Sequence, residues 1–190
     1  MIRTAILLAA GRSRRFGVEN KLLHIVDGKT MLEIAIHNLQ SAAVFDEIVV
    51  VCGHQQELVA AIARQSGVSV TYSREWECGI AESIKAGVLA ATTAEVLLFM
   101  PADMPYLSAT TIAKVALAVD ENHPVVCTKN NDYLGVPTAF LLKSYREELL
   151  ALAGDQGAKH ILTKCINPVV IAASAQELVD IDYVSCIGFS

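Results

Sequence analysis

Short apolar runs alternate with longer amphipathic stretches along most of the chain. Five runs are predicted to be strands: Ala5–Leu8, Glu47–Cys52, Val68–Tyr72, Glu95–Met100 and Pro124–Thr128. Four stretches between them carry apolar residues at helical spacing: Met31–Ala42, Gln55–Gln65, Ala81–Ala91 and Ser108–Asp120. This alternation is typical of βαβ units on a parallel sheet. We therefore predict a three-layer α/β/α sandwich with a mostly parallel, Rossmann-like sheet.

The pattern becomes less regular beyond residue 130. We predict one more strand at Val136–Leu141, helices at Ser144–Ala153 and Asp155–Thr163, and a short strand at Val169–Ile171. No internal repeat and no linker rich in proline, glycine or serine interrupts the chain. The sequence therefore predicts one domain over residues 1–190.

Composition narrows the class of protein. With 53% hydrophobic residues the chain can form a sizeable core, and its net charge of −5 argues against a broad basic surface for nucleic acid. Positive charge is nevertheless concentrated near the start, where the first 21 positions hold one acid, Glu19, and five basic residues: Arg3, Arg12, Arg14, Arg15 and Lys21. Such a local cluster fits a pocket for a phosphorylated ligand.

The five cysteines indicate a reducing compartment. Their number is odd, and they are scattered without CxxC spacing, so neither a disulfide framework nor a structural zinc site is expected. The first apolar run is too short for a secretory signal or a membrane span. We therefore expect a cytoplasmic protein that does not bind membranes.

The first candidate site is the stretch LAAGRSRRFG, Leu8 to Gly17, which directly follows the first predicted strand. In open α/β sheets, ligands bind beyond the carboxyl ends of the strands. Gly11 can adopt backbone angles that let amide groups approach a phosphate. The stretch matches neither GxxxxGK[ST] nor GxGxxG, so these residues alone leave the ligand open.

Two acidic segments are candidates for a metal site. In LLFMPADMPYL, Asp103 follows a buried strand and lies in a turn with Pro101 and Pro105, where one carboxylate can ligate Mg²⁺. In LVDIDY, Asp180 and Asp182 point to one face if the segment is extended. A second magnesium ligand could come from there.

Each candidate also has a plainer interpretation. The arginines could form a solvated surface loop, and the late aspartates could be ordinary surface acids. Asp103 could close a turn or cap the helix expected near Ser108. Gly79 and Ser83 could simply begin a helix, and Trp76 could be either a lid residue or a packing anchor.

Together with Asn20 and Lys21, the stretch LAAGRSRRFG resembles the signature LAAGxSxRxG…K of the MobA-like nucleotidyltransferase family. Members transfer a nucleoside monophosphate from a nucleoside triphosphate (NTP) to a phosphorylated acceptor. Within the family the chain resembles the MocA branch, the molybdenum cofactor cytidylyltransferases, in five further segments: CGIAESIKAGV, PADMPYL, GVPTAF, LALAGDQGAKHIL and DID. It departs from that branch at Val136, where histidine is usual, and at Tyr183-Val184-Ser185, where Thr-Pro-Glu/Asp is usual.

The resemblance implies a Mg²⁺-dependent cytidylyltransferase. The phosphate of a molybdopterin-type acceptor attacks the α-phosphorus of CTP and pyrophosphate leaves, with no covalent enzyme intermediate. The implied catalytic residues are Arg15, Lys21 and Asp103, and the implied metal ligands are Asp103 and Asp182. The implied nucleotide-binding residues are Leu8, Ala9, Ala10, Gly11, Arg12, Ser13, Lys21, Gly79, Ser83 and Asp103.

Alternatives remain open at this point. One is transfer of GMP or another nucleotide, to molybdenum cofactor or to a sugar phosphate, which the altered residue Val136 favours. Another is a carrier or chaperone that binds nucleotide or cofactor without catalysis. For the enzyme, a molybdenum hydroxylase is the expected recipient of the product, and no nucleic-acid partner is expected.

Overall fold

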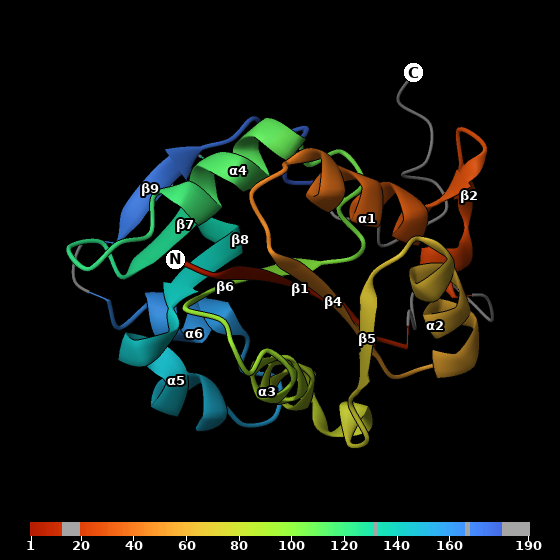
Figure 1. Ribbon diagram of the computed structural model, residues 1–190, viewed down its shortest axis with the longest axis horizontal. Helices are drawn as coiled ribbons and strands as arrows, with labels where there is room; N and C mark the ends of the chain where they lie inside the picture. Colours follow the sequence, from red (N-terminus) through yellow and green to blue (C-terminus); the bar gives the residue numbers. More distant parts are fainter. Residues whose placement is uncertain (13–19, 131–132, 166–167, 180–190) are drawn as a thin grey trace.

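A seven-stranded sheet forms the middle layer of the protein, in the order β5-β4-β1-β6-β8-β7-β9 (Figure 1). The structure is a computed structural model, and it describes residues 1–12, 20–130, 133–165 and 168–179. The strands are β1 (Arg3–Ala9), β4 (Glu47–Cys52), β5 (Ser69–Tyr72), β6 (Val96–Pro101), β7 (Val125–Asn130), β8 (Tyr133–Leu141) and β9 (Val169–Ala172). In this sheet only β8 pairs antiparallel with its neighbours, so the predicted mostly parallel sheet is confirmed.

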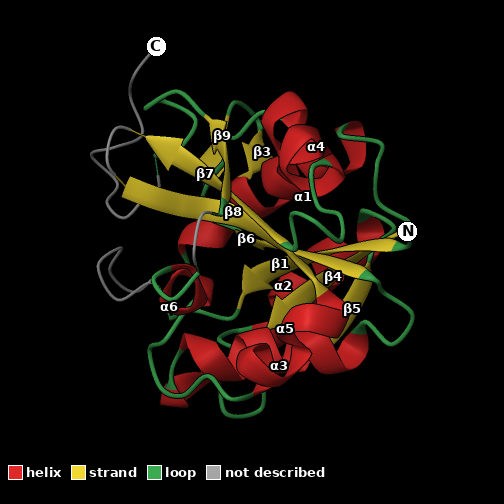
Figure 2. Cartoon of the chain, turned by 90° about the vertical axis from the view of Figure 1, so that its left-hand side faces the viewer, coloured by secondary structure: helices red, strands yellow, loops and turns green. Residues whose placement is uncertain are grey.

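Helices cover both faces of this sheet, as the predicted three-layer sandwich requires (Figure 2). One face carries α1 (Met31–Ser41), α2 (Gln56–Gln65) and α4 (Ala109–Leu117), and the other carries α3 (Ile80–Ala90), α5 (Leu142–Leu150) and α6 (Ala158–Leu162). β1 contributes side chains to the hydrophobic cores on both faces of the sheet, because Ala5 and Leu7 pack toward α1 while Ile6 packs toward α3. Burial on both faces explains why this strand is apolar from Ala5 to its end at Ala9.

Local sequence signals account for the start of several elements. α1 begins with a capping box, in which the Thr30 hydroxyl accepts from the Glu33 amide while the Glu33 carboxylate accepts from the Thr30 amide. A small hairpin precedes it, formed by β2 (Ile25–Val26) and β3 (Lys29–Thr30). The hairpin turns at Asp27-Gly28, where both residues have positive φ. An Asp-Gly pair is a strong hairpin signal, and this is the element that the periodicity analysis overlooked.

The last predicted helix is shorter than expected. We expected a helix over Asp155–Thr163, but α6 starts only at Ala158, after Gly157 as its N-cap. Gly154 has a φ of +57°. The Gln156 amide donates to the Ala153 carbonyl, and the Ala153 amide donates to the Gln156 side chain, so these bonds close a turn. Residues 153–157 therefore form a loop at the carboxyl edge of the sheet rather than a first helical turn.

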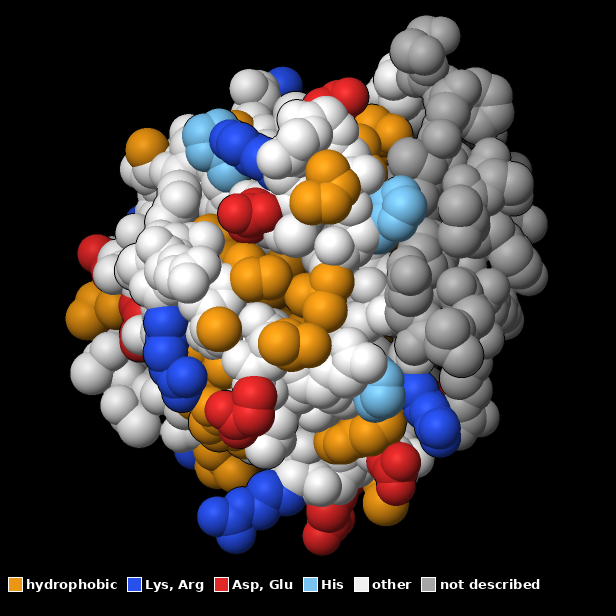
Figure 3. Space-filling model, turned by 90° about the vertical axis from the view of Figure 1, so that its right-hand side faces the viewer, with side chains coloured by type: hydrophobic (Ala, Val, Ile, Leu, Met, Phe, Trp, Pro, Cys, Tyr) orange, Lys and Arg blue, Asp and Glu red, His pale blue; other side chains and the backbone are white. Residues whose placement is uncertain are grey.

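The surface at the β5 edge is mixed. Hydrophobic side chains lie there among charged side chains and histidines (Figure 3). The hairpin and α2 lie on this side of the molecule (Figure 1), and they carry the exposed residues Ile25 and Leu58. Within the described parts of the chain, no helix is both long enough and apolar enough to cross a bilayer.

Glu177 ties the segment after β9 to the start of α4. Its carboxylate accepts hydrogen bonds from the Ser108 and Thr111 hydroxyls, at 2.5 and 2.7 Å, and from Ser174. Burial raises the pKa of this carboxyl, but the hydrogen bonds from Ser108, Thr111 and Ser174 outweigh that effect and lower the pKa to about 2. The charged form of Glu177 therefore stabilises the fold.

We expect Glu177→Gln to lower the free energy of unfolding by about 1–2 kcal/mol at pH 7, because hydrogen bonds to a charged acceptor are lost. A depressed folded-state pKa gives stability that is present above the unfolded pKa near 4.5 and lost as pH falls toward 2. The difference between the two proteins should therefore shrink across that window in denaturant titrations. Glu147→Gln, on the exposed surface of α5, is the matched control. A constant difference down to pH 2 would contradict the assignment.

Candidate functional site

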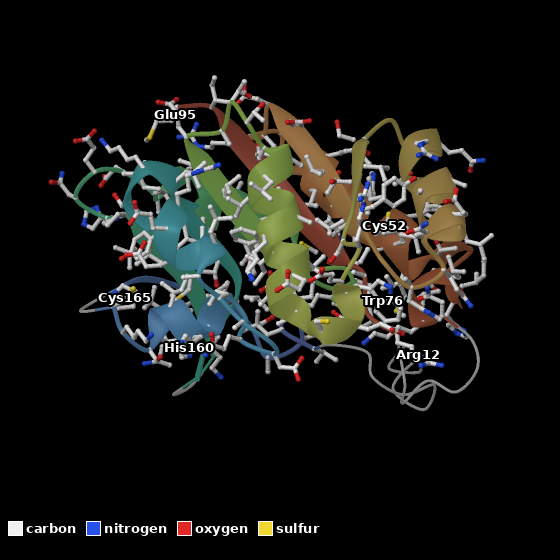
Figure 4. The ribbon with its side chains drawn as sticks, turned by 90° about the horizontal axis from the view of Figure 1, so that it is seen from below. Arg12, Cys52, Trp76, Glu95, His160 and Cys165 are labelled. Carbon is white, nitrogen blue, oxygen red and sulfur yellow. The ribbon has the colours of Figure 1, made fainter. Side chains whose placement is uncertain are left out.

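A cavity opens at the carboxyl edge of the sheet where β1 and β6 end. It is a cavity of about 530 Å³ lined by Leu8, Ala10, Gly11, Arg12, Lys21, Leu22, Trp76, Glu77, Gly79, Ile80, Ser83, Pro101, Asp103 and Asp155. Figure 4 shows Arg12 and Trp76 near each other at this edge of the molecule. This is the position at which open α/β sheets bind ligands.

The end of β1 is held from both sides. The His54 amide, after β4, donates to the Ala10 carbonyl at 3.0 Å, and the Ala102 amide, after β6, donates to the Leu8 carbonyl at 3.1 Å. Gly53 lies so close that a Cβ there would be 2.7 Å from the Ala10 Cβ. The floor of the cavity is therefore rigid backbone before any ligand enters.

Gly11 leaves open space at the end of this strand. A Cβ at this position would meet no atom of the described residues within 4 Å, and the residue is exposed. Its backbone is not in the positive-φ region, so the structure does not use the conformational freedom that the sequence analysis emphasised. The absence of a side chain instead gives a ligand direct access to the backbone.

An ion pair joins the segment after β1 to the end of β6. Lys21 lies in the short 3₁₀ helix η2 (Lys21–Leu23), and its Nζ donates to Asp103 Oδ2 at 2.5 Å. The side chains are only 14% and 18% exposed, which reduces screening by water. The cap of α4 is Ser108, whose hydroxyl accepts from the Thr111 amide, so Asp103 is not that cap.

The second oxygen of Asp103 fits a metal ligand. Asp103 Oδ1 is buried and has no hydrogen-bond partner among the described residues, which is costly unless a ligand completes the site. The described residues contain no cluster of three or more histidine, cysteine, aspartate or glutamate side chains placed to hold a metal. Mg²⁺ needs no such cluster, because it is commonly held by one or two carboxylates together with substrate phosphates and water.

The N-terminus of α3 forms the opposite wall. Gly79 has a φ of +118°, and a Cβ there would lie 2.2 Å from the backbone of Gly154. The Ala81 amide donates to the Gly154 carbonyl at 3.1 Å. This close backbone contact brings Asp155 into the cavity, although the sequence analysis did not select it. Asp155 lies in the segment LALAGDQGAKHIL, which resembles a motif of the MocA branch, so this resemblance was the sequence signal for it.

Apolar side chains supply the remaining wall. Leu22, Trp76, Ile80 and Pro101 line the cavity and were not predicted as site residues. The Trp76 ring packs against Gly53, and its centroid lies 5.4 Å from that of His54. Trp76 is therefore a packing residue that also presents a surface to the cavity.

Residues 5–170 match the profile of the MobA-like NTP transferase domain. The chain belongs to this family. A molybdenum cofactor guanylyltransferase of Shewanella amazonensis is 30% identical over 158 residues, which cover 80% of this chain and 76% of that protein. The nicotine blue oxidoreductase of Paenarthrobacter nicotinovorans is 31% identical over 115 residues, 60% of this chain and 56% of that relative's length.

The structural comparison agrees with the sequence comparison. A nucleotidyl transferase from Methanothermobacter thermautotroptrophicus superimposes with a TM-score of 0.84 and 26% identity, covering 97% of this chain and 93% of that one. The resemblance stated from the motifs is thus confirmed at the level of the family. The chain is a MobA-like nucleotidyltransferase domain.

The MobA-like domain brings together most of the predicted nucleotide-binding residues. Eight of them line the cavity: Leu8, Ala10, Gly11, Arg12, Lys21, Gly79, Ser83 and Asp103. The side chain of Ala9 instead belongs to the core beneath α1. Ser13, Arg15 and Asp182, and also Arg14 and Asp180, lie outside the described residues. The roles assigned to all these residues stay predictions.

Two of the cysteines are buried in the core. Burial raises the pKa of the Cys52 thiol to about 12 and that of Cys127 to about 11. Both thiols are therefore neutral near pH 7 and do not supply a thiolate nucleophile.

Gly79→Ala and Gly11→Ala form a matched pair that tests the cavity walls. Gly79→Ala should lower the free energy of unfolding by about 3 kcal/mol, because its Cβ meets the Gly154 backbone at a positive φ. Gly11→Ala should leave stability within about 0.5 kcal/mol, because its Cβ faces open space. Thermal and denaturant unfolding measure both. If both variants lose the same free energy of unfolding, the backbone contact between Gly79 and Gly154 is not tight.

Proposed function

We propose that the protein transfers a nucleoside monophosphate from an NTP to the terminal phosphate of a molybdopterin-type cofactor, with release of pyrophosphate. The observation that carries the proposal is the Lys21–Asp103 ion pair in the cavity at the ends of β1 and β6. In this pair Asp103 Oδ1 has no hydrogen-bond partner among the described residues. The names of several relatives as molybdenum cofactor guanylyltransferases support this acceptor.

The nucleotide base is the finer part of the proposal. The MocA-like motifs favour CTP, while the relatives named guanylyltransferases favour GTP as the competing donor. Val136 stands where histidine is usual in the MocA branch, and this difference favours a sugar phosphate as the competing acceptor. A non-catalytic carrier would bind the same ligands without turnover, so the assay below also separates that class.

In the proposed reaction the chain positions two anionic ligands. Arg12 and Lys21 balance the charge of the triphosphate, with Arg15 proposed to join them. The exposed backbone at Gly11 is open to phosphate oxygens at the end of β1. Holding both ligands in line for displacement at the α-phosphorus then supplies much of the rate enhancement.

We propose that Mg²⁺ is bound by Asp103, with Asp182 as a second ligand. When bound, the ion would neutralise charge on the phosphate oxygens during transfer. Asp103 fits this task because one oxygen is fixed by Lys21 and the other has no partner in the part of the chain that the structure describes. Lys21 thus orients the ligand as well as contributing its own charge. The product would be delivered to a molybdenum hydroxylase.

Pyrophosphate release tests the function directly. Purified protein is incubated with Mg²⁺, molybdopterin-type cofactor and CTP, GTP or ATP, and the nucleotide that gives the highest kcat/KM is the donor. Pyrophosphate release that requires both the acceptor and the metal supports the proposal, and chelation with EDTA should abolish it. Nucleotide binding without release on any phosphorylated acceptor would support the carrier instead.

Asp103→Asn should reduce kcat by about 100-fold, because it removes charge that acts on the transferring group while keeping the size of the side chain. Glu147→Gln makes the same charge change on exposed α5 and should leave kcat unchanged. Trp76 is the sole tryptophan and lines the cavity, so its fluorescence measures nucleotide binding separately from catalysis. An Asp103→Asn protein that turns over normally would overturn the assignment.

A further inference from the structure

The cavity has unlike charges on its two walls. Arg12 and Lys21 come from the segments that follow β1, and Leu22 beside Lys21 belongs to the core beneath α1. Asp155 comes from the opposite side, where Ala81 and Ala158 belong to the core between α3 and α6. Two phosphate-bearing ligands explain the basic wall. They do not explain Glu77 and Asp155, the acidic residues that line the cavity on the α3 side, because carboxylates repel phosphate.

Asp155 is held in place by backbone rather than by its own side chain. The Gly154 carbonyl accepts from the Ala81 amide, and Gly154 packs directly on Gly79. The Gln156 side chain accepts from the Ala153 amide at 3.1 Å and closes the same turn. The loop is therefore fixed on the N-terminus of α3, and the Asp155 backbone is fixed with it.

The carboxylate of Asp155 has no structural task in the described chain. α6 begins with Gly157 as its N-cap and has no side-chain capping bond, so Asp155 does not cap it. No ion pair or side-chain hydrogen bond involves Asp155 among the described residues. Asp155 is exposed, and its carboxylate stands on a loop whose backbone is fixed at the wall of the cavity, so it is available to a ligand that offers hydrogen-bond donors.

We propose that Asp155 is a specificity residue that binds the donor edge of a 2-amino-4-oxopyrimidine ring. That edge carries a ring N–H next to an exocyclic amino group, and the two donors match the two oxygens of one carboxylate. It occurs both in guanine and in a pterin, so either the nucleotide or the acceptor can present it. Cytosine has only one such donor beside a ring acceptor. The inference rests on the proposed function, because it assigns a partner within that site.

Equilibrium binding tests the inference without requiring turnover. Calorimetry measures GTP, ITP, CTP and unphosphorylated pterin with the wild type, Asp155→Asn and the exposed-surface control Glu147→Gln. ITP differs from GTP by lacking the exocyclic amino group. Asp155→Asn should weaken GTP or pterin by about 10- to 100-fold and leave CTP within about 2-fold. Glu147→Gln should change none of them.

These binding measurements distinguish whether the nucleotide or the acceptor presents the ring to Asp155. If guanine is the partner, the wild type binds GTP about 10-fold more tightly than ITP and Asp155→Asn removes that preference. If the acceptor is the partner, pterin affinity falls while GTP, ITP and CTP do not change. Equal weakening of all the nucleotides, unchanged affinity for both GTP and pterin, or no binding of either by the wild type would overturn the inference.

Failure of the proposed function gives a different result. A wild type that binds GTP or pterin but releases no pyrophosphate contradicts the transfer reaction and leaves the Asp155 comparison valid. Thermal unfolding of Asp155→Asn should match that of the wild type, because the loop is held by Gly154 and Gln156. Asp155→Glu should restore part of the lost affinity, since it keeps the charge.

Discussion

The ion pair between Lys21 and Asp103 connects two segments that are 82 residues apart in sequence and meet only at the carboxyl edge of the sheet. Both side chains are largely buried, so water screens the attraction between the two charges less than it would at the surface. The contact also fixes which oxygen of Asp103 is occupied and which is available. The chemistry proposed for the site depends on that asymmetry.

Backbone packing supports the same edge. Gly53 permits the end of β4 to lie against Ala10 and Trp76, and Gly79 permits the start of α3 to lie against Gly154. In both places a methyl group would meet backbone or ring atoms at less than 3 Å. The cavity is therefore shaped by positions where a side chain is excluded as much as by the side chains that line it.

The cavity combines features that suit two different ligand regions. Arg12 and Lys21 provide positive charge close to the open backbone at Gly11, which suits phosphates. Trp76 and Ile80 provide apolar surface, and Asp155 provides an acceptor on the loop that is fixed against α3. This separation fits the proposed function, in which the cavity would discriminate at a ring while transfer would take place at a phosphate.

The sequence by itself determined the layered fold and one side of the site. β6 and the stretch Ala5–Ala9 of β1 are buried and apolar, so the position and parallel pairing of these strands could be predicted. Gly11 and Asp103, which lie two residues beyond the two strands, followed from the rule for strand ends. Only the tertiary structure decided that Asp155 and Trp76 lie in the same cavity. Their neighbours come from distant segments, and periodicity describes which face of an element is buried but not which loops the crossover connections bring together.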